Sequence, residues 1–123
     1  ERSGSSLLDT NAIIYAINRK LLFPKGVYSA SVITKMELLS WPQLTQEDEQ
    51  KLRQILLGVN VVELLPAIQE TTIKIRRATA LKLPDSIISA TAMSIGAILV
   101  TNDEKLRHRH VGESITLDEL LGK

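Results

Sequence analysis

The chain contains no cysteine, which excludes disulfide bonds, thiolate zinc sites and cysteine nucleophiles. This absence agrees with a reducing compartment, and we expect a cytoplasmic protein. No apolar run approaches the roughly 20 residues that span a bilayer, and the first residues lack the apolar core of a signal peptide. We therefore expect no transmembrane helix and no membrane partner.

The chain also has few aromatic residues and almost no net charge. Aromatic residues make up 3% of the chain, and 15 Lys and Arg nearly balance 14 Asp and Glu, for a formal net charge of +1. A broad nucleic-acid-binding surface usually brings a basic excess, and base-stacking platforms need aromatic side chains. Any contact with nucleic acid is therefore expected to be local, or helped by a metal ion or a second subunit.

The remaining composition is that of one globular domain. Hydrophobic residues make up 44% of the 123 residues, enough for a single core. The polar segment Glu1–Ser6 is expected to be a leader or an expression remnant, and the domain is expected over residues 7–123. No internal repeat or long linker divides this part of the chain.

Short apolar runs alternate with amphipathic segments. Strands are expected over residues 6–9, 59–64, 97–101 and 114–117. Helices are expected over residues 12–17, from Ser29 or Ser31 to residue 39, from the Thr45 capping signal to Gly58, over 66–81, over 84–95 and around Glu104, with a last turn over 118–121. This alternation predicts an α/β fold with three layers, α/β/α, around a mainly parallel central sheet.

Four acidic residues interrupt apolar surroundings: Asp9, Glu37, Asp85 and Asp103. Asp9 and Asp103 follow expected strands, and ligands of open parallel sheets bind at the carboxyl ends of strands. If the first and third expected strands are neighbours, these two carboxylates face one cleft. The carboxylates of Glu37 and Asp85, which lie on helices, can then complete a ring of four acids around this cleft.

Carboxylates held close together repel one another and take up protons unless a cation neutralises them. A divalent metal ion resolves this conflict, and ligation by oxygen alone favours Mg²⁺ or Mn²⁺ over Zn²⁺. Such an ion can orient a phosphodiester and activate water for its hydrolysis. The acids therefore predict a Mg²⁺ or Mn²⁺ site.

Four segments carry a family resemblance: residues 7–11 (LLDTN), 31–38 (SVITKMEL), 81–92 (LKLPDSIISATA) and 99–103 (LVTND). In this order they resemble the signature blocks of PIN domains, most closely those of VapC-type ribonuclease toxins from type II toxin–antitoxin systems. The resemblance covers nearly the whole chain from Leu7. It implies a metal-dependent endoribonuclease that leaves a 5′ phosphate and a 3′ hydroxyl, an antitoxin partner that blocks the site, and a homodimer.

The resemblance also implies roles for single residues. Asp9, Glu37, Asp85 and Asp103 match the family's catalytic, metal-binding acids, with Asp9 and Asp103 as direct ligands. The polar side chains expected to orient these carboxylates are Thr10, Asn11 and Thr101. Two positions depart from the pattern, because Leu106 replaces a frequent aromatic residue and Ala80 a frequent glycine.

Each candidate also has a structural interpretation. Asp9 and Asp103 can be helix N-caps or turn residues, Asp85 can complement a helix dipole, and Glu37 can be an ion-pair partner. The candidate RNA-binding residues can also be solvated helix surface: Arg76 and Arg77 with Lys74 and Lys82, and Arg107 and Arg109, whose charge run is more typical of such a surface. His108 and His110 are poorly spaced for one metal site, and Trp41 is expected in the core or at a dimer interface.

Two other functions remain open. A catalytically silent PIN-like module would bind RNA or protein without cleavage. A phosphoacceptor receiver or an aspartate-nucleophile phosphatase would need paired acids or an Asp-x-Asp motif after the first strand. The segment Asp9-Thr10-Asn11 has neither.

Overall fold

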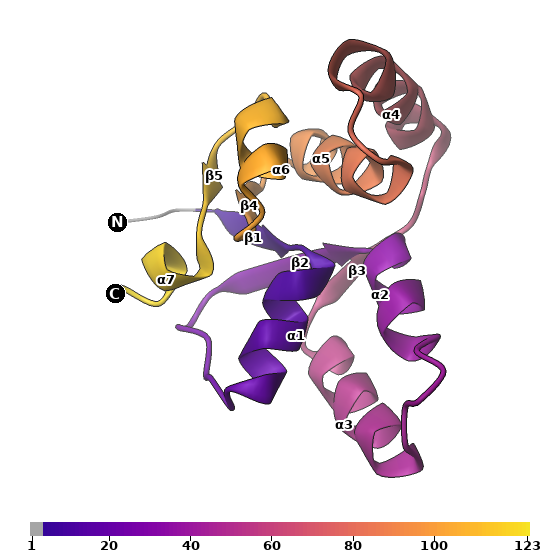
Figure 1. Cartoon of the computed structure of the whole chain (residues 1–123). Coiled ribbons are helices and arrows are strands. Elements are labelled where there is room, and N and C mark those ends of the chain that lie inside the picture. Colours follow the sequence, from indigo (N-terminus) through magenta and orange to yellow (C-terminus); the bar gives the residue numbers. More distant parts are fainter. Residues whose placement is uncertain (1–3) are drawn as a thin grey trace.

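The computed structural model describes residues 4–123 and contains a five-stranded sheet between layers of helices (Figure 1). The strands are β1 (Ser5–Leu8), β2 (Val27–Ser31), β3 (Asn60–Val62), β4 (Ile98–Val100) and β5 (Ser114–Ile115). They are ordered β3-β2-β1-β4-β5, and all neighbouring pairs are parallel. The expected α/β class is therefore confirmed.

Helices cover both faces of this sheet. They are α1 (Thr10–Asn18), α2 (Val32–Leu39), α3 (Gln46–Leu57), α4 (Pro66–Thr79), α5 (Leu83–Ile95), α6 (Glu104–Arg109) and α7 (Leu117–Leu120). In Figure 1, α1, α2 and α3 lie on one side of the sheet, and α4, α5 and α6 lie on the other. None of the described helices is long and apolar enough to cross a membrane.

The two central strands supply two separate cores. Leu7 of β1 and Leu99 of β4 pack with residues of α4, α5 and α6. Their chain neighbours Leu8 and Val100 pack with residues of α1, α2, α3 and α7. Successive side chains of a strand point to opposite faces, so adjacent residues fill opposite cores. The result is the expected α/β/α arrangement.

The strand β2 was not expected, because its sequence lacks a run of large β-branched residues. Ser29 and Ala30 are buried in the sheet, and tertiary burial decides their conformation more than local propensity does. The expectation that a helix begins at Ser29 is therefore wrong. The alternative start is confirmed, because Ser31 is the N-cap of α2. The strand β1 also begins earlier than expected, at Ser5, so the last two residues assigned to a leader belong to the sheet.

Other sequence signals for the ends of helices are confirmed. The Thr45 side chain accepts a hydrogen bond from the Asp48 N–H at the start of α3, and Gly58 is the C-cap of that helix. Pro66 lies in the first turn of α4. That helix ends earlier than expected, at Thr79, because Ala80 adopts a left-handed conformation with φ of 58°.

Candidate active site

The strand order reverses at the centre of the sheet. From β1 the chain continues to β2 and β3 on one side, whereas β4 and β5 lie on the other side of β1. The carboxyl ends of β1 and β4 therefore flank the place where ligands of open α/β sheets bind. Asp9 directly follows β1, and Thr101 directly follows β4. The neighbouring strands required by the sequence interpretation are thus present.

Asp9 is 4% exposed and is fixed at both carboxylate oxygens. The Ala12 N–H donates to its Oδ1 over 2.7 Å, and the Thr101 hydroxyl donates to its Oδ2 over 2.5 Å. The first bond makes Asp9 the N-cap of α1, as one structural interpretation predicted. The second bond links β1 to the end of β4 and is not explained by capping.

Thr101 and Thr10 hold other acids of the candidate site. The Thr101 Oγ1 also accepts the Asp103 N–H over 3.0 Å, so one buried hydroxyl contacts both Asp9 and Asp103. The Thr10 hydroxyl donates to Glu37 Oε1 over 2.6 Å, joining the start of α1 to α2. Asp103 Oδ1 caps α6 by accepting the Leu106 N–H over 3.1 Å.

The charges of the four acids are linked: Asp85 and Asp103 act on Asp9, and Asp103 and Glu37 act on Asp85. Burial raises the pKa of Asp9, and the charges of Asp85 and Asp103 raise it further, while its hydrogen bonds from Thr101 and Ala12 lower it. Burial also raises the pKa of Asp85, in the first turn of α5, and the charges of Asp103 and Glu37 add to this. Helix capping alone does not explain such mutual repulsion.

Two asparagines, of which only Asn11 was expected to orient the acids, make different contacts. Asn11 is exposed in the first turn of α1, and its side chain makes no hydrogen bond among residues 4–123. Asn102 was not expected to matter, but its Oδ1 accepts the Leu117 N–H over 2.9 Å and ties the segment after β4 to α7. No periodic pattern marks such a contact, because Asn102 lies in a loop.

The basic residues expected to bind RNA differ in exposure and in hydrogen bonding. Arg76 and Arg77 are exposed in the last turn of α4, and Arg109 Nη1 donates to the Thr79 carbonyl oxygen over 2.8 Å at the end of that helix. Arg107 is half-buried, and its Nε has no hydrogen-bond partner in the described part of the chain. The charge of Lys105, which the sequence interpretation did not single out, acts on Asp85 together with Lys82.

Neither histidine belongs to a group of metal-binding side chains in the described part of the chain. His110 is buried, and its Nδ1 lies 2.6 Å from the Ser89 hydroxyl. His108 Nδ1 lies 2.8 Å from the Glu104 carbonyl oxygen. Among residues 4–123, no three His, Cys, Asp or Glu side chains are close enough to bind one ion together.

The donor set nevertheless fits Mg²⁺ or Mn²⁺. The atoms available are carboxylate and hydroxyl oxygens, which hard divalent ions prefer, and Mg²⁺ commonly keeps several waters and uses only one or two carboxylates. Burial raises the pKa of both Asp9 and Asp85, and the charges of neighbouring acids raise it further, so a bound cation would favour the charged form of both carboxylates.

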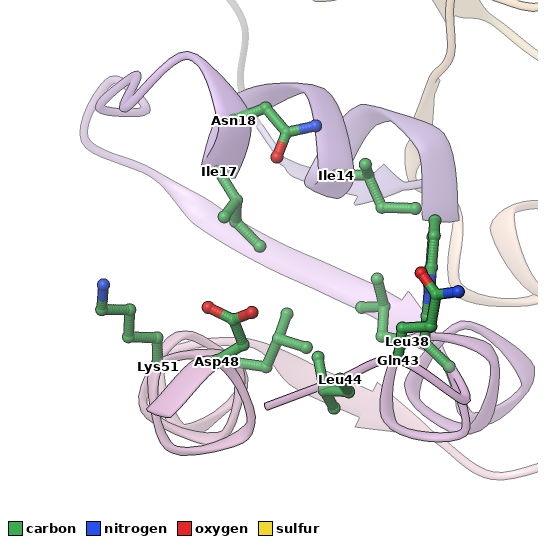
Figure 2. Close-up of a pocket in the computed structure, with 10 residues that line it drawn as sticks. Ile14, Ile17, Asn18, Leu38, Gln43, Leu44, Asp48 and Lys51 are labelled. Atoms are coloured by element: carbon green, nitrogen blue, oxygen red, sulfur yellow. The ribbon is translucent and has the colours of Figure 1, made fainter. Parts of the chain in front are cut away.

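A separate apolar groove of about 320 Å³ lies between α1, the α2–α3 connection and α3 (Figure 2). Figure 2 shows Ile14 and Ile17 of α1 facing Leu44 and Asp48 across it. Trp41 also lines the groove and is 53% exposed, so a place in the core is wrong, whereas a place at a dimer interface stays a prediction. The four acids do not line this groove.

Comparison with known proteins identifies the family. The family model described as PIN domain matches residues 6–111, and the chain therefore belongs to the PIN domain family. No curated protein matches the chain significantly.

Several solved structures share the fold. A toxin–antitoxin complex from Klebsiella pneumoniae has a TM-score of 0.78 and 28% identity, covering 91% of this chain and 97% of that chain. VapBC-1 from nontypeable Haemophilus influenzae has a TM-score of 0.77 and 23% identity, covering 93% and 98%. VapBC2 from Rickettsia felis, bound to a DNA fragment from its promoter, has a TM-score of 0.76 and 21% identity, covering 92% and 98%.

Proposed function

We propose that this PIN-domain protein is a VapC-like toxin that hydrolyses RNA phosphodiesters with Mg²⁺ or Mn²⁺. The observation that supports this most strongly is the set of four acids around the ends of β1 and β4. Repulsion from the neighbouring acids acts on both Asp9 and Asp85, the chain belongs to the PIN domain family, and the four acids resemble that family's catalytic acids. A catalytically silent module has no need to keep all four.

Asp9 and Asp103 would bind the metal directly, and Asp85 and Glu37 would complete its surroundings. A bound Mg²⁺ or Mn²⁺ supplies Lewis-acid activation of water and neutralises phosphate charge. Asp9 is held for this task by Thr101, whose hydrogen bond favours the charged carboxylate. The Thr10 hydroxyl, at the start of α1, orients Glu37 through its hydrogen bond to Oε1.

The test is cleavage of unstructured RNA by wild-type protein and by Asp85→Asn and Glu37→Gln variants, with Mn²⁺ or Mg²⁺. We expect both variants to lose at least about tenfold in kcat/KM, because each removes one charge from the proposed site. Glu70→Gln, an exposed acid of α4, is the matched control and should cleave like the wild type. RNA that is bound but left intact with either ion would favour the silent module instead.

We propose an antitoxin as the protein partner, as suggested by the similar K. pneumoniae chain, which belongs to a toxin–antitoxin complex. The apolar groove offers a surface for it, since Trp41 is half-exposed and Leu38, next to Glu37, also lines it. Trp41→Glu should prevent the cognate antitoxin from inhibiting RNA cleavage. Leu22→Glu changes a 90% exposed residue outside the groove and should leave inhibition intact.

The resemblance to VapC-type toxins also suggests a homodimer in the cytoplasm. Sedimentation of the purified protein tests the dimer directly, and a monomer at every concentration would rule it out.

A further inference from the structure

Two lysines lie beside the candidate site without forming part of its acid set. Lys82 is the N-cap residue of α5, three residues before Asp85, and Lys105 is the second residue of α6, two residues after Asp103. Their positive charges both act on the Asp85 carboxylate. Cations at the starts of two separate helices therefore act on the same acid.

Neither lysine is engaged in an ion pair within the described residues. By contrast, Lys51 pairs with Glu47 over 3.2 Å and Arg53 with Glu49 over 2.9 Å, both on α3. Lys82 and Lys105 are exposed. Their ammonium groups thus keep their hydrogen-bonding capacity for an anion that approaches the acids.

More cations adjoin these lysines on the same side of the sheet. Arg109 of α6 donates to the Thr79 carbonyl oxygen, which holds α6 against the end of α4. Arg76 and Arg77 are exposed at that end of α4. Since α4, α5 and α6 share one side of the sheet (Figure 1), these arginines belong to the same helical layer as Lys82 and Lys105. The opposite helical layer carries the apolar groove and the paired charges of α3.

We infer that Lys82 and Lys105 bind backbone phosphates of a single-stranded RNA next to the phosphate that is cleaved, so that the RNA enters along the α5–α6 side. This inference rests on the proposed function and adds the direction of the substrate and the residues that hold it. Lysine binds phosphate as a point charge and reads no base. The two lysines therefore position the strand and leave sequence choice to other residues.

The experiment measures binding of a fluorescent oligouridine in EDTA, where metal-dependent cleavage is prevented, as a function of salt. Removing one lysine–phosphate interaction should reduce the slope of log K against log salt by about 0.7, which is about fivefold in affinity at 0.1 M salt. Lys82→Gln and Lys105→Gln should each show this reduction, and both should retain the wild-type melting temperature. Lys105→Arg should restore the slope, because it keeps the charge.

Lys25→Gln is the matched control, since Lys25 is exposed in the segment before β2, at the opposite end of the strands. Unchanged slopes for both lysine variants, an equal reduction in the control, or no RNA binding by the wild type would each overturn the inference. In a parallel assay with Mn²⁺, the lysine variants should raise KM more than they lower kcat. A wild-type protein that binds as expected but cleaves no RNA would instead contradict the proposed function alone.

Discussion

The hydrogen bond from Thr101 to Asp9 provides a stringent test of how the candidate site is built. Thr101→Val replaces the fully buried hydroxyl by a methyl group of similar size. It removes the donor to Asp9 Oδ2 and the acceptor of the Asp103 N–H. A hydrogen bond to a charged group contributes about 1.5–3 kcal/mol, and water can replace the bond to the exposed Asp103. We therefore expect the free energy of unfolding at pH 7 to fall by about 2 kcal/mol.

The effect should depend on pH, because Thr101 favours the charged form of Asp9. Without that bond the pKa of Asp9, already raised by burial, rises further. A carboxyl whose pKa is raised by folding stabilises the protein at low pH, and this stability is lost as the pH rises through the folded pKa. The difference between wild type and Thr101→Val should therefore be largest near neutral pH and shrink as Asp9 becomes protonated.

Urea unfolding at several pH values measures both quantities. Thr91→Val is the matched control, since Thr91 is also buried but donates to the Ile87 carbonyl oxygen of its own helix, with no carboxylate involved. Its variant should lose less stability, and the loss should not vary with pH. Equal stability of Thr101→Val and wild type at pH 7, or a loss that is constant down to pH 3, would refute the reasoning.

Three further predictions concern the framework. Ala80→Gly should raise the free energy of unfolding by about 0.5–1 kcal/mol in thermal or urea unfolding, because it removes the Cβ from a left-handed position; a decrease would contradict this. Gly112→Ala should lower it by about 1–3 kcal/mol, because the new Cβ would lie 2.9 Å from His110 Nε2, on a buried ring. Burial lowers the pKa of His110 from its ordinary value of 6.5, so the unfolded state takes up the proton first, and stability should fall as the pH drops below 6.5. His110→Gln should weaken that fall, and an identical pH profile would argue against it.

Most of the fold is predictable because strong local signals agree with tertiary burial. The β-branched run that contains β3 and the apolar run of β4 are hydrophobic enough to identify strands, and Pro66 and Gly96 mark helix ends. The strand β2 escaped prediction because Ser29 and Ala30 are small and give no local preference for a strand. Their conformation is set by pairing with β1 and β3, which no local pattern contains.

The acids of the site were identifiable for a different reason. A carboxylate among apolar residues is costly to bury without a partner, so Asp9 and Glu37 stand out in sequence. The supporting roles of Thr10 and Thr101 are predicted only by the family resemblance, because no local pattern marks these residues before folding brings them to the acids. The effect of the Lys105 charge on Asp85 is likewise visible only in the folded structure.

Two of the candidate catalytic acids are also helix N-caps. Asp9 and Asp103 each use Oδ1 to cap a helix, through the N–H groups of Ala12 and Leu106. The structural interpretation of both residues is therefore correct, and it does not exclude a functional one. A cap fixes the rotamer of the carboxylate, which is what a metal ligand also requires.

The most direct test of the proposed function is the chemistry at the cut ends of RNA incubated with the purified protein and Mn²⁺. Hydrolysis by activated water at the acid site predicts fragments with a 5′ phosphate and a 3′ hydroxyl, abolished by EDTA and by Asp9→Asn. Fragments with a 2′,3′-cyclic phosphate, or cleavage that persists in EDTA, would show that the RNA 2′ hydroxyl attacks instead and would contradict the carboxylate–metal account.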